Sequence, residues 1–137
     1  MSTPSAQVIQ DELARVADPE KAAFFPRFFK TGPGEYAEGD VFLGVTVPEQ
    51  RRIARRYKHL ALEQVAELLR SKVHEHRFTG FVILVEKFEA AEEPECSRLF
   101  AFCREHLAAL NNWDLVDTVA PRVLGAYLIE HPELRPW

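Results

Sequence analysis

Helical periodicity is the feature that most constrains what this chain can fold into. Apolar residues recur every three or four positions along most of its 137 residues, which is the spacing of one face of an α-helix. The alternation of apolar and polar residues that indicates a strand is confined to a weak pattern in VFLGVTV (41–47). With 47% hydrophobic and 28% charged residues, the composition is typical of a globular protein. We therefore expect a single all-α domain over residues 1–137.

Capping residues and prolines divide this pattern into helices. Asp18-Pro19 is a typical helix start, because an aspartate caps the first turn and proline fits the first helical position. Thr46 followed by Pro48 is a second start, and His131-Pro132 is a stop. The predicted helices cover residues 5–16, a phenylalanine-rich stretch from residue 19, and residues 48–58, 61–71, 73–90, 95–110 and 112–130, with a glycine-rich loop at 31–40.

The lengths of the helices indicate that they come in pairs. One pair covers about 48–71 and the next about 73–109, which suits a helical-hairpin repeat of roughly 40 residues, as in HEAT-like solenoids. An irregular helical bundle is the alternative. The apolar residues of 112–130 occupy a wide arc that a neighbouring helix normally covers. Either this helix self-associates with a second copy of the chain, or the chain is the N-terminal part of a longer solenoid, truncated after about three helix pairs.

Charge and cysteine content limit the functional classes. The formal net charge is −4, from 17 basic and 21 acidic residues, whereas nucleic-acid binders usually carry excess positive charge. Cys96 and Cys103 share one helix face and are typical of buried thiols in a reducing cytosol, with a disulfide or metal site as the alternative. The sequence shows neither a signal-peptide pattern nor an apolar run of about 20 residues. We expect a cytoplasmic protein with no membrane partner.

The stretch NNWDLVDTVAP (111–121) holds the first candidate site. Trp113 and Asp117 are four positions apart and therefore share one helix face, near the edge of an apolar stripe. Pro121 has no N–H to donate to the carbonyl of Asp117, so the helix should kink there. The alternative is structural, with Trp113 packing on the domain and Asp117 as a solvated first-turn carboxylate.

A basic ridge is the second candidate. Its members are Arg51, Arg52, Arg55, Arg56 and Lys58, and the spacing places Arg51 with Arg55 in one row and Arg52 with Arg56 in the next. Arginines in such rows bind phosphate oxygens bidentately. The alternative is a solvated face that is neutralised by Glu49 and nearby acids.

The histidines of the segment HEHR (74–77) do not form a metal site. His74 and His76 are two positions apart and point to different sides of a helix, whereas zinc sites on helices use spacings of three or four. We predict instead a capping segment with structural hydrogen bonds, and no metal.

Four segments together resemble a known family. DPEKAAFFPRFFK (18–30), FLGVTVPEQRRIARRY (42–57), NNWDLVDTVAPRVLG (111–125) and HPEL (131–134), in this order and spacing, are similar to the AlkD-like DNA alkylation repair proteins. These are HEAT-like solenoids that act as DNA glycosylases on alkylated bases. The resemblance spans about residues 18–134. It departs from the family at Asn112, where a second tryptophan is common, and at Phe28, which is tyrosine in a well-known member.

The resemblance implies a function and assigns residues to it. The activity is removal of cationic N-alkylated purines, of the N3-methyladenine and N7-methylguanine type, from double-stranded DNA, with no cofactor. By position, Asp117 is similar to the catalytic carboxylate and Trp113 to the tryptophan that packs against the DNA backbone at the lesion. The DNA-binding residues that it implies, besides Trp113, are Phe28, Lys30, Arg51 and Arg55. Two alternatives stay open: a non-catalytic HEAT-like module that binds DNA or protein, and a helical domain that dimerises through 112–130.

Overall fold

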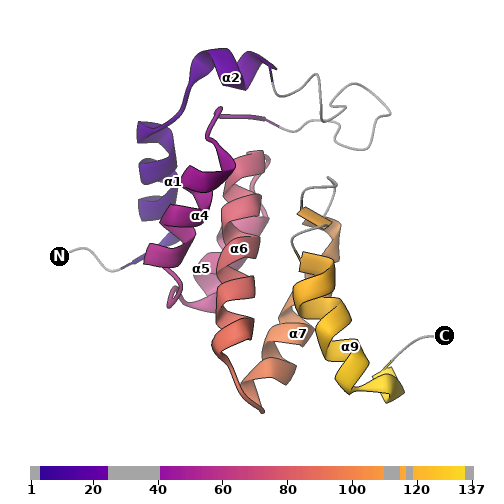
Figure 1. Ribbon diagram of the computed structural model, residues 1–137. Helices are drawn as coiled ribbons and strands as arrows, with labels where there is room; N and C mark the ends of the chain where they lie inside the picture. Colours follow the sequence, from indigo (N-terminus) through magenta and orange to yellow (C-terminus); the bar gives the residue numbers. More distant parts are fainter. Residues whose placement is uncertain (1–3, 25–40, 110–114, 117–118, 135–137) are drawn as a thin grey trace.

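The computed structural model describes residues 4–24, 41–109, 115–116 and 119–134, and within these residues every regular element is helical (Figure 1). The predicted all-α fold is therefore confirmed, and the arrangement is consistent with a helical repeat. The α-helices are α1 (Ala6–Arg15), α2 (Pro19–Phe24), α4 (Val47–Arg56), α5 (Leu62–Leu69), α6 (His74–Ala90), α7 (Glu95–Glu105) and α9 (Ala126–Glu130). Two short 3₁₀ turns, η1 (Leu107–Ala109) and η3 (Pro132–Leu134), and a π-helical segment, η2 (Ala120–Gly125), complete the set.

Several helix starts lie where the sequence places them. The hydroxyl of Ser5 accepts a hydrogen bond from the amide of Val8, and Asp18 accepts one from the amide of Glu20, so both residues cap the helix that follows. The weak alternation of VFLGVTV is not a strand. It forms an extended segment with one isolated bridge, between Val41 and Val73, before α4 begins at Val47.

Helix α6 is the centre of the described structure. It packs against α1, α4, α5, α7 and η2, and Figure 1 shows it between α4 on one side and α9 on the other. Its sequence explains this position, because FTGFVILV is apolar on every side and a helix of that kind must be covered all round. The side chains of Phe78, Phe81, Ile83 and Leu84 are at most 2% exposed.

Of the two predicted helix pairs, the second is found and the first is not. Helices α4 and α5 both pack mainly against α6, and each also contacts α1. Gly80 allows the close approach of α5 to α6, because a Cβ at this position would lie 3.0 Å from the Leu69 side chain and 3.2 Å from Leu68. The prediction of a 48–71 pair is therefore wrong. Helix α7 packs on α6, as the 73–109 pair predicts, and η2 packs on both α7 and α6.

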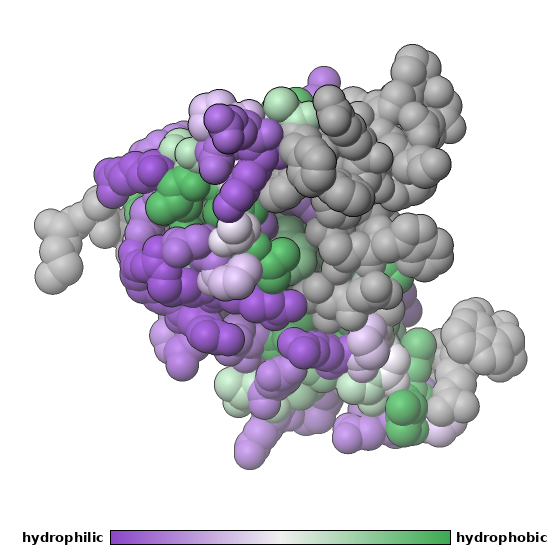
Figure 2. Space-filling view, turned by 45° about the horizontal axis from the view of Figure 1, so that its top comes forward, coloured by the Kyte–Doolittle hydropathy of each residue, from purple (hydrophilic) through white to green (hydrophobic). Residues whose placement is uncertain are grey.

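The described surface is mostly hydrophilic in the space-filling view of Figure 2. The exposed large apolar residues are distributed over separate elements, and Ile129 of α9 is the most exposed of them at 71%. No described helix combines the length and the apolar character needed to cross a membrane. Both cysteines are free thiols. Cys103 is buried, which raises its pKa to about 12, and Cys96 is half-buried.

A buried carboxylate fixes the segment before α4. Glu75, in the first turn of α6, is 1% exposed and accepts hydrogen bonds from the amides of Leu43 (3.0 Å), Gly44 (2.9 Å) and Val45 (3.2 Å). Gly44 has a φ of +83°, and a Cβ there would lie 2.1 Å from the carbonyl oxygen of Asp18. The amide of Asp18 in turn donates to the carbonyl of Leu43 at 3.0 Å. One side chain thus holds the start of α2 and the segment 41–45 against α6.

We predict that Glu75→Gln destabilises the fold by roughly 2–4 kcal/mol, because the introduced NH₂ group would face backbone donors that then lose their acceptor. Urea unfolding measures the change. Glu67→Gln is the matched control, since Glu67 is an exposed acid of α5 paired only with Arg70 at 3.0 Å, and it should cost less than about 1 kcal/mol. Equal unfolding midpoints for the two variants would show that the buried carboxylate does not anchor the segment.

Candidate nucleic-acid interface

The residues predicted to carry the chemistry lie outside the part of the chain that the structure describes. This holds for Trp113 and Asp117 and for two of the predicted DNA contacts, Phe28 and Lys30. Their roles stay predictions. Arg51 and Arg55, the other predicted DNA contacts, are described, and so is most of the helical column that follows NNWD.

Buried residues anchor that C-terminal column. Leu115 and Val119 are 0% exposed, Val123 is 1% exposed, and Tyr127 of α9 is 5% exposed. The spacing of four places them on one side, toward α6 and α7. Tyr127 stacks on Phe100 of α7 with ring centroids 4.6 Å apart. The predicted buried stripe is therefore confirmed for Leu115, Val119 and Val123, whereas Val116, its other predicted member, is half-buried.

The helix departs from α-helical geometry at the proline. The π-helical segment η2 starts at Ala120 and has Pro121 in its first turn. Proline lacks the N–H that continues an α-helical hydrogen-bond ladder, so a wider turn at this point relieves the missing donor. The disturbance that the sequence predicted at Pro121 takes this form, between the buried residues Val119 and Val123.

The basic ridge on α4 is divided into two rows with different partners. Arg52 pairs with Glu49 and Arg56 pairs with Glu12 of α1, so acids neutralise this row, as the alternative interpretation predicted. The second row turns toward α6. Arg55 lies 3.8 Å from Glu86 through its Nε atom and is 68% exposed, which leaves most of its guanidinium accessible to a ligand.

Arg51 has a structural contact besides its predicted role in binding DNA. Its guanidinium carbon lies 5.6 Å from the ring centroid of Phe78, which is buried in α6. This geometry is a cation–π contact, and the half-buried arginine stem covers apolar surface as well. Replacing Arg51 would therefore alter packing as well as charge, and Arg55 is the cleaner position for testing a phosphate contact.

The segment 74–77 makes structural hydrogen bonds, as predicted, but no side chain caps the start of α6. The hydrogen bonds of this region meet at Ser71, just before the segment. The Ser71 hydroxyl accepts a hydrogen bond from the amide of Val73 at 3.0 Å and lies 2.8 Å from Nδ1 of His76. Arg77 donates to the carbonyl of Ser71 at 2.9 Å. Burial, and then the nearby charge of Arg77, lower the pKa of His76 from 6.5 to about 4. Among the described residues no group of three potential ligands could hold a metal ion.

Two residues of this region, Glu75 and Lys87, are not predicted from the sequence. Glu75 is the anchor of the FLG segment, and its signal is an acid in the first turn of a helix whose middle, FTGFVILV, is apolar on every side. Lys87, near the other end of α6, lines a hollow together with Lys58, the last member of the ridge. Nothing in local spacing links these two lysines, because they belong to different helical segments.

A comparison with protein families identifies the chain. The model of the family "DNA alkylation repair enzyme" matches residues 9–137. The chain belongs to this family. No similar sequence is found among curated proteins. Membership of the DNA alkylation repair enzymes accounts for the matched segments FLGVTVPEQRRIARRY and NNWDLVDTVAP together, and it supports a role in the repair of alkylated DNA.

The lowered pKa of His76 predicts a dependence of stability on pH. The folded chain keeps His76 neutral down to about pH 4, whereas the unfolded chain takes up a proton below about 6.5. This part of the stability is therefore present at pH 7 and lost as the pH falls toward 4. Between pH 7 and 5 we expect a loss of about 1 kcal/mol from this residue, after allowance for solvent screening.

The measurement is urea unfolding at pH 7 and pH 5 for the wild type, His76→Asn and the exposed-site control His59→Asn. Asparagine can keep a hydrogen bond to Ser71 but does not titrate. His76→Asn should reduce the difference between the two pH values, and His59→Asn should leave it unchanged. An unaltered difference in His76→Asn would assign the pH dependence to other groups.

Proposed function

We propose that this chain is a DNA glycosylase that hydrolyses the N-glycosidic bond of cationic N-alkylated purines in double-stranded DNA, of the N3-methyladenine and N7-methylguanine type. The observation that carries the proposal is the family match over residues 9–137, which includes NNWDLVDTVAP with Trp113 and Asp117. As part of the proposal, the chain forms one HEAT-like helical domain and uses no cofactor.

The chemistry explains why a carboxylate and an indole suit this reaction. An alkylated purine carries positive charge, so when the bond from C1′ to the base nitrogen breaks, the electron pair neutralises the leaving base. The sugar becomes cationic, as in glycoside hydrolysis. The carboxylate of Asp117 stabilises this cation, positions the water that adds to C1′ and accepts its proton. The indole face of Trp113 attracts the same charge and excludes bulk water.

The described residues on either side of position 117 support the proposal. Leu115 and Val119 are both fully buried. A carboxylate stabilises a developing charge most strongly when it is held in place beforehand, and buried residues close to it in the sequence favour such an arrangement. The DNA backbone would be bound by Arg51 and Arg55 of α4, with Phe28 and Lys30 as further contacts.

A second candidate function is a non-catalytic module that binds DNA or protein. The net charge of −4 and the pairing of Arg52 and Arg56 with acids favour its protein-binding form, because both weaken a general attraction for DNA. The two functions can be distinguished at Asp117, because a glycosylase needs its carboxylate for catalysis and a binding module does not.

We predict that Asp117→Asn lowers the rate of release of N7-methylguanine from alkylated duplex DNA by about 100-fold or more, while binding of the duplex is kept. The matched control is Asp114→Asn, which changes a neighbouring carboxylate of the same motif and should retain most of the rate. Release that is equally fast in wild type and Asp117→Asn would exclude the catalytic assignment. Absence of release from every form, with binding retained, would favour the non-catalytic module.

We also predict that the two arginine rows differ in DNA binding. Arg55→Gln should reduce the slope of log affinity against log salt by about one, because one phosphate contact is lost. Arg52→Gln removes the same charge from the neutralised row of the same helix and should leave the slope nearly unchanged. Fluorescence anisotropy with an undamaged duplex at several salt concentrations measures both. Equal slopes in the two variants would overturn the assignment of Arg55 to the DNA backbone.

A further inference from the structure

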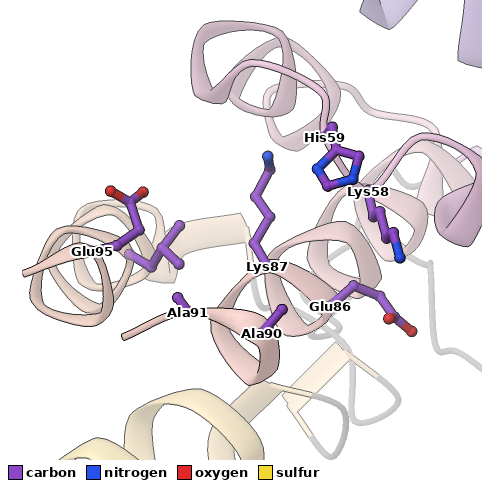
Figure 3. Close-up of a pocket in the computed structure, with 8 residues that line it drawn as sticks. Lys58, His59, Glu86, Lys87, Ala90, Ala91 and Glu95 are labelled. Carbon is purple, nitrogen blue, oxygen red and sulfur yellow. The ribbon is translucent and has the colours of Figure 1, made fainter. Parts of the chain in front are cut away.

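A hollow of about 300 Å³ lies where the end of α4, the last turns of α6 and the start of α7 meet (Figure 3). Its charged and ionisable lining residues are Lys58, His59, Glu86, Lys87 and Glu95. In Figure 3 the side chain of Lys87 extends toward the ring of His59, and the two carboxylates lie on opposite sides of Lys87. Three nitrogen-bearing side chains from two segments therefore line one space.

Both carboxylates of the hollow are already engaged by arginines that do not line it. Glu86 lies 3.8 Å from Arg55, and Glu95 lies 3.0 Å from Arg98. The charges of these two acids are thereby offset from outside the hollow. The lining therefore holds two ammonium groups and two carboxylates, and each carboxylate has an arginine partner as well.

The two lysines, Lys58 and Lys87, unlike the two acids, have no ion-pair partner among the described residues. Lys87 is half-buried, and burial lowers its pKa, with a smaller opposing effect from Glu95. A partly buried ammonium group without a close counter-ion is costly, and an anion in the hollow would remove that cost.

We propose that this hollow binds one phosphate group, held by Lys58, His59 and Lys87. A phosphate offers several acceptor oxygens around one centre, which suits the Lys87 ammonium group and the imidazole N–H of His59. The exposed Lys58 side chain points toward the side of Glu86 in Figure 3, and it would turn toward these two groups to bind the same phosphate. The volume is sufficient for one such group. A single carboxylate offers two oxygens and one charge, and would satisfy this set of donors less well.

The hollow also continues the row of α4 that faces α6. Arg55 contacts Glu86, which lines the hollow, and Lys58 follows Arg55 by less than one helical turn. The phosphate can come from a DNA backbone or from a free phosphate compound. If the phosphate belongs to a DNA backbone, the inference rests on the proposed function. The ability of the hollow to bind a phosphate group does not depend on that function.

The test has two arms, and the first uses inorganic phosphate. Wild type, Lys58→Gln, Lys87→Met and the control Arg70→Gln are titrated with phosphate at constant ionic strength, and the amide and imidazole signals of His59 are followed by NMR. Lys87→Met keeps the apolar stem, and Lys58 is exposed, so both variants should fold. We expect phosphate binding to weaken about tenfold in each lysine variant. It should be unchanged in Arg70→Gln, because Arg70 is the C-cap of α5 and lies outside the hollow.

The second arm measures the salt dependence of binding to an undamaged duplex with the same four proteins. A decrease of the slope by about one in Lys58→Gln and Lys87→Met, but not in Arg70→Gln, would identify the DNA backbone as the source of the phosphate. Phosphate binding that depends on the lysines, without any binding of the duplex, would support a free phosphate compound and contradict the proposed function instead. If neither phosphate nor duplex binding depends on Lys58 and Lys87, the phosphate site is wrong.

Discussion

The described structure depends on one buried carboxylate and three backbone amides. Glu75 is removed from water and is tolerated because Leu43, Gly44 and Val45 donate hydrogen bonds to it. This contact sets where the extended segment lies on α6, and the segment in turn fixes Asp18 and the start of α2. Hydrophobic burial brings α6 to the centre, but it is not directional. The hydrogen bonds at Glu75 are directional, and they determine the register in which the N-terminal elements meet the core.

The sequence predicts the helices well and their partners poorly, for a physical reason. Ser5 and Asp18 mark helix starts through local hydrogen bonds, which depend only on residues two or three positions away. Which helix packs on which depends on complementary surfaces that are distant in sequence. Gly80 is an example, because its missing side chain lets α5 approach α6, and a glycine inside an apolar helix does not say which neighbour it accommodates. The predicted pairing of 48–58 with 61–71 is wrong for this reason, whereas the contact between the helices predicted at 73–90 and 95–110 is found.

The same limit applies to the candidate interface. The ridge of arginines is visible in the sequence, but of the acids that divide it only Glu49 lies close to it in the sequence. Arg56 is neutralised by Glu12, 44 positions away, and Arg55 meets Glu86 on α6. Lys87 joins Lys58 only because α6 passes the end of α4. The resemblance to the DNA alkylation repair enzymes supplies roles for Trp113 and Asp117, which lie outside the described residues and which no local pattern separates from packing residues.

Helix α6 links these features mechanically. Its N-terminal turn holds the segment before α4 through Glu75, its last turns carry Glu86 and Lys87, and its flank supports η2 and the column with Val123 and Tyr127. A backbone-binding ridge and a carboxylate that must meet one sugar can act together only if their separation is constant. A helix that is buried on nearly all sides varies little in position, because any shift opens cavities along its length. The apolar sequence of α6 is therefore as much a condition for the proposed chemistry as the charged residues around it.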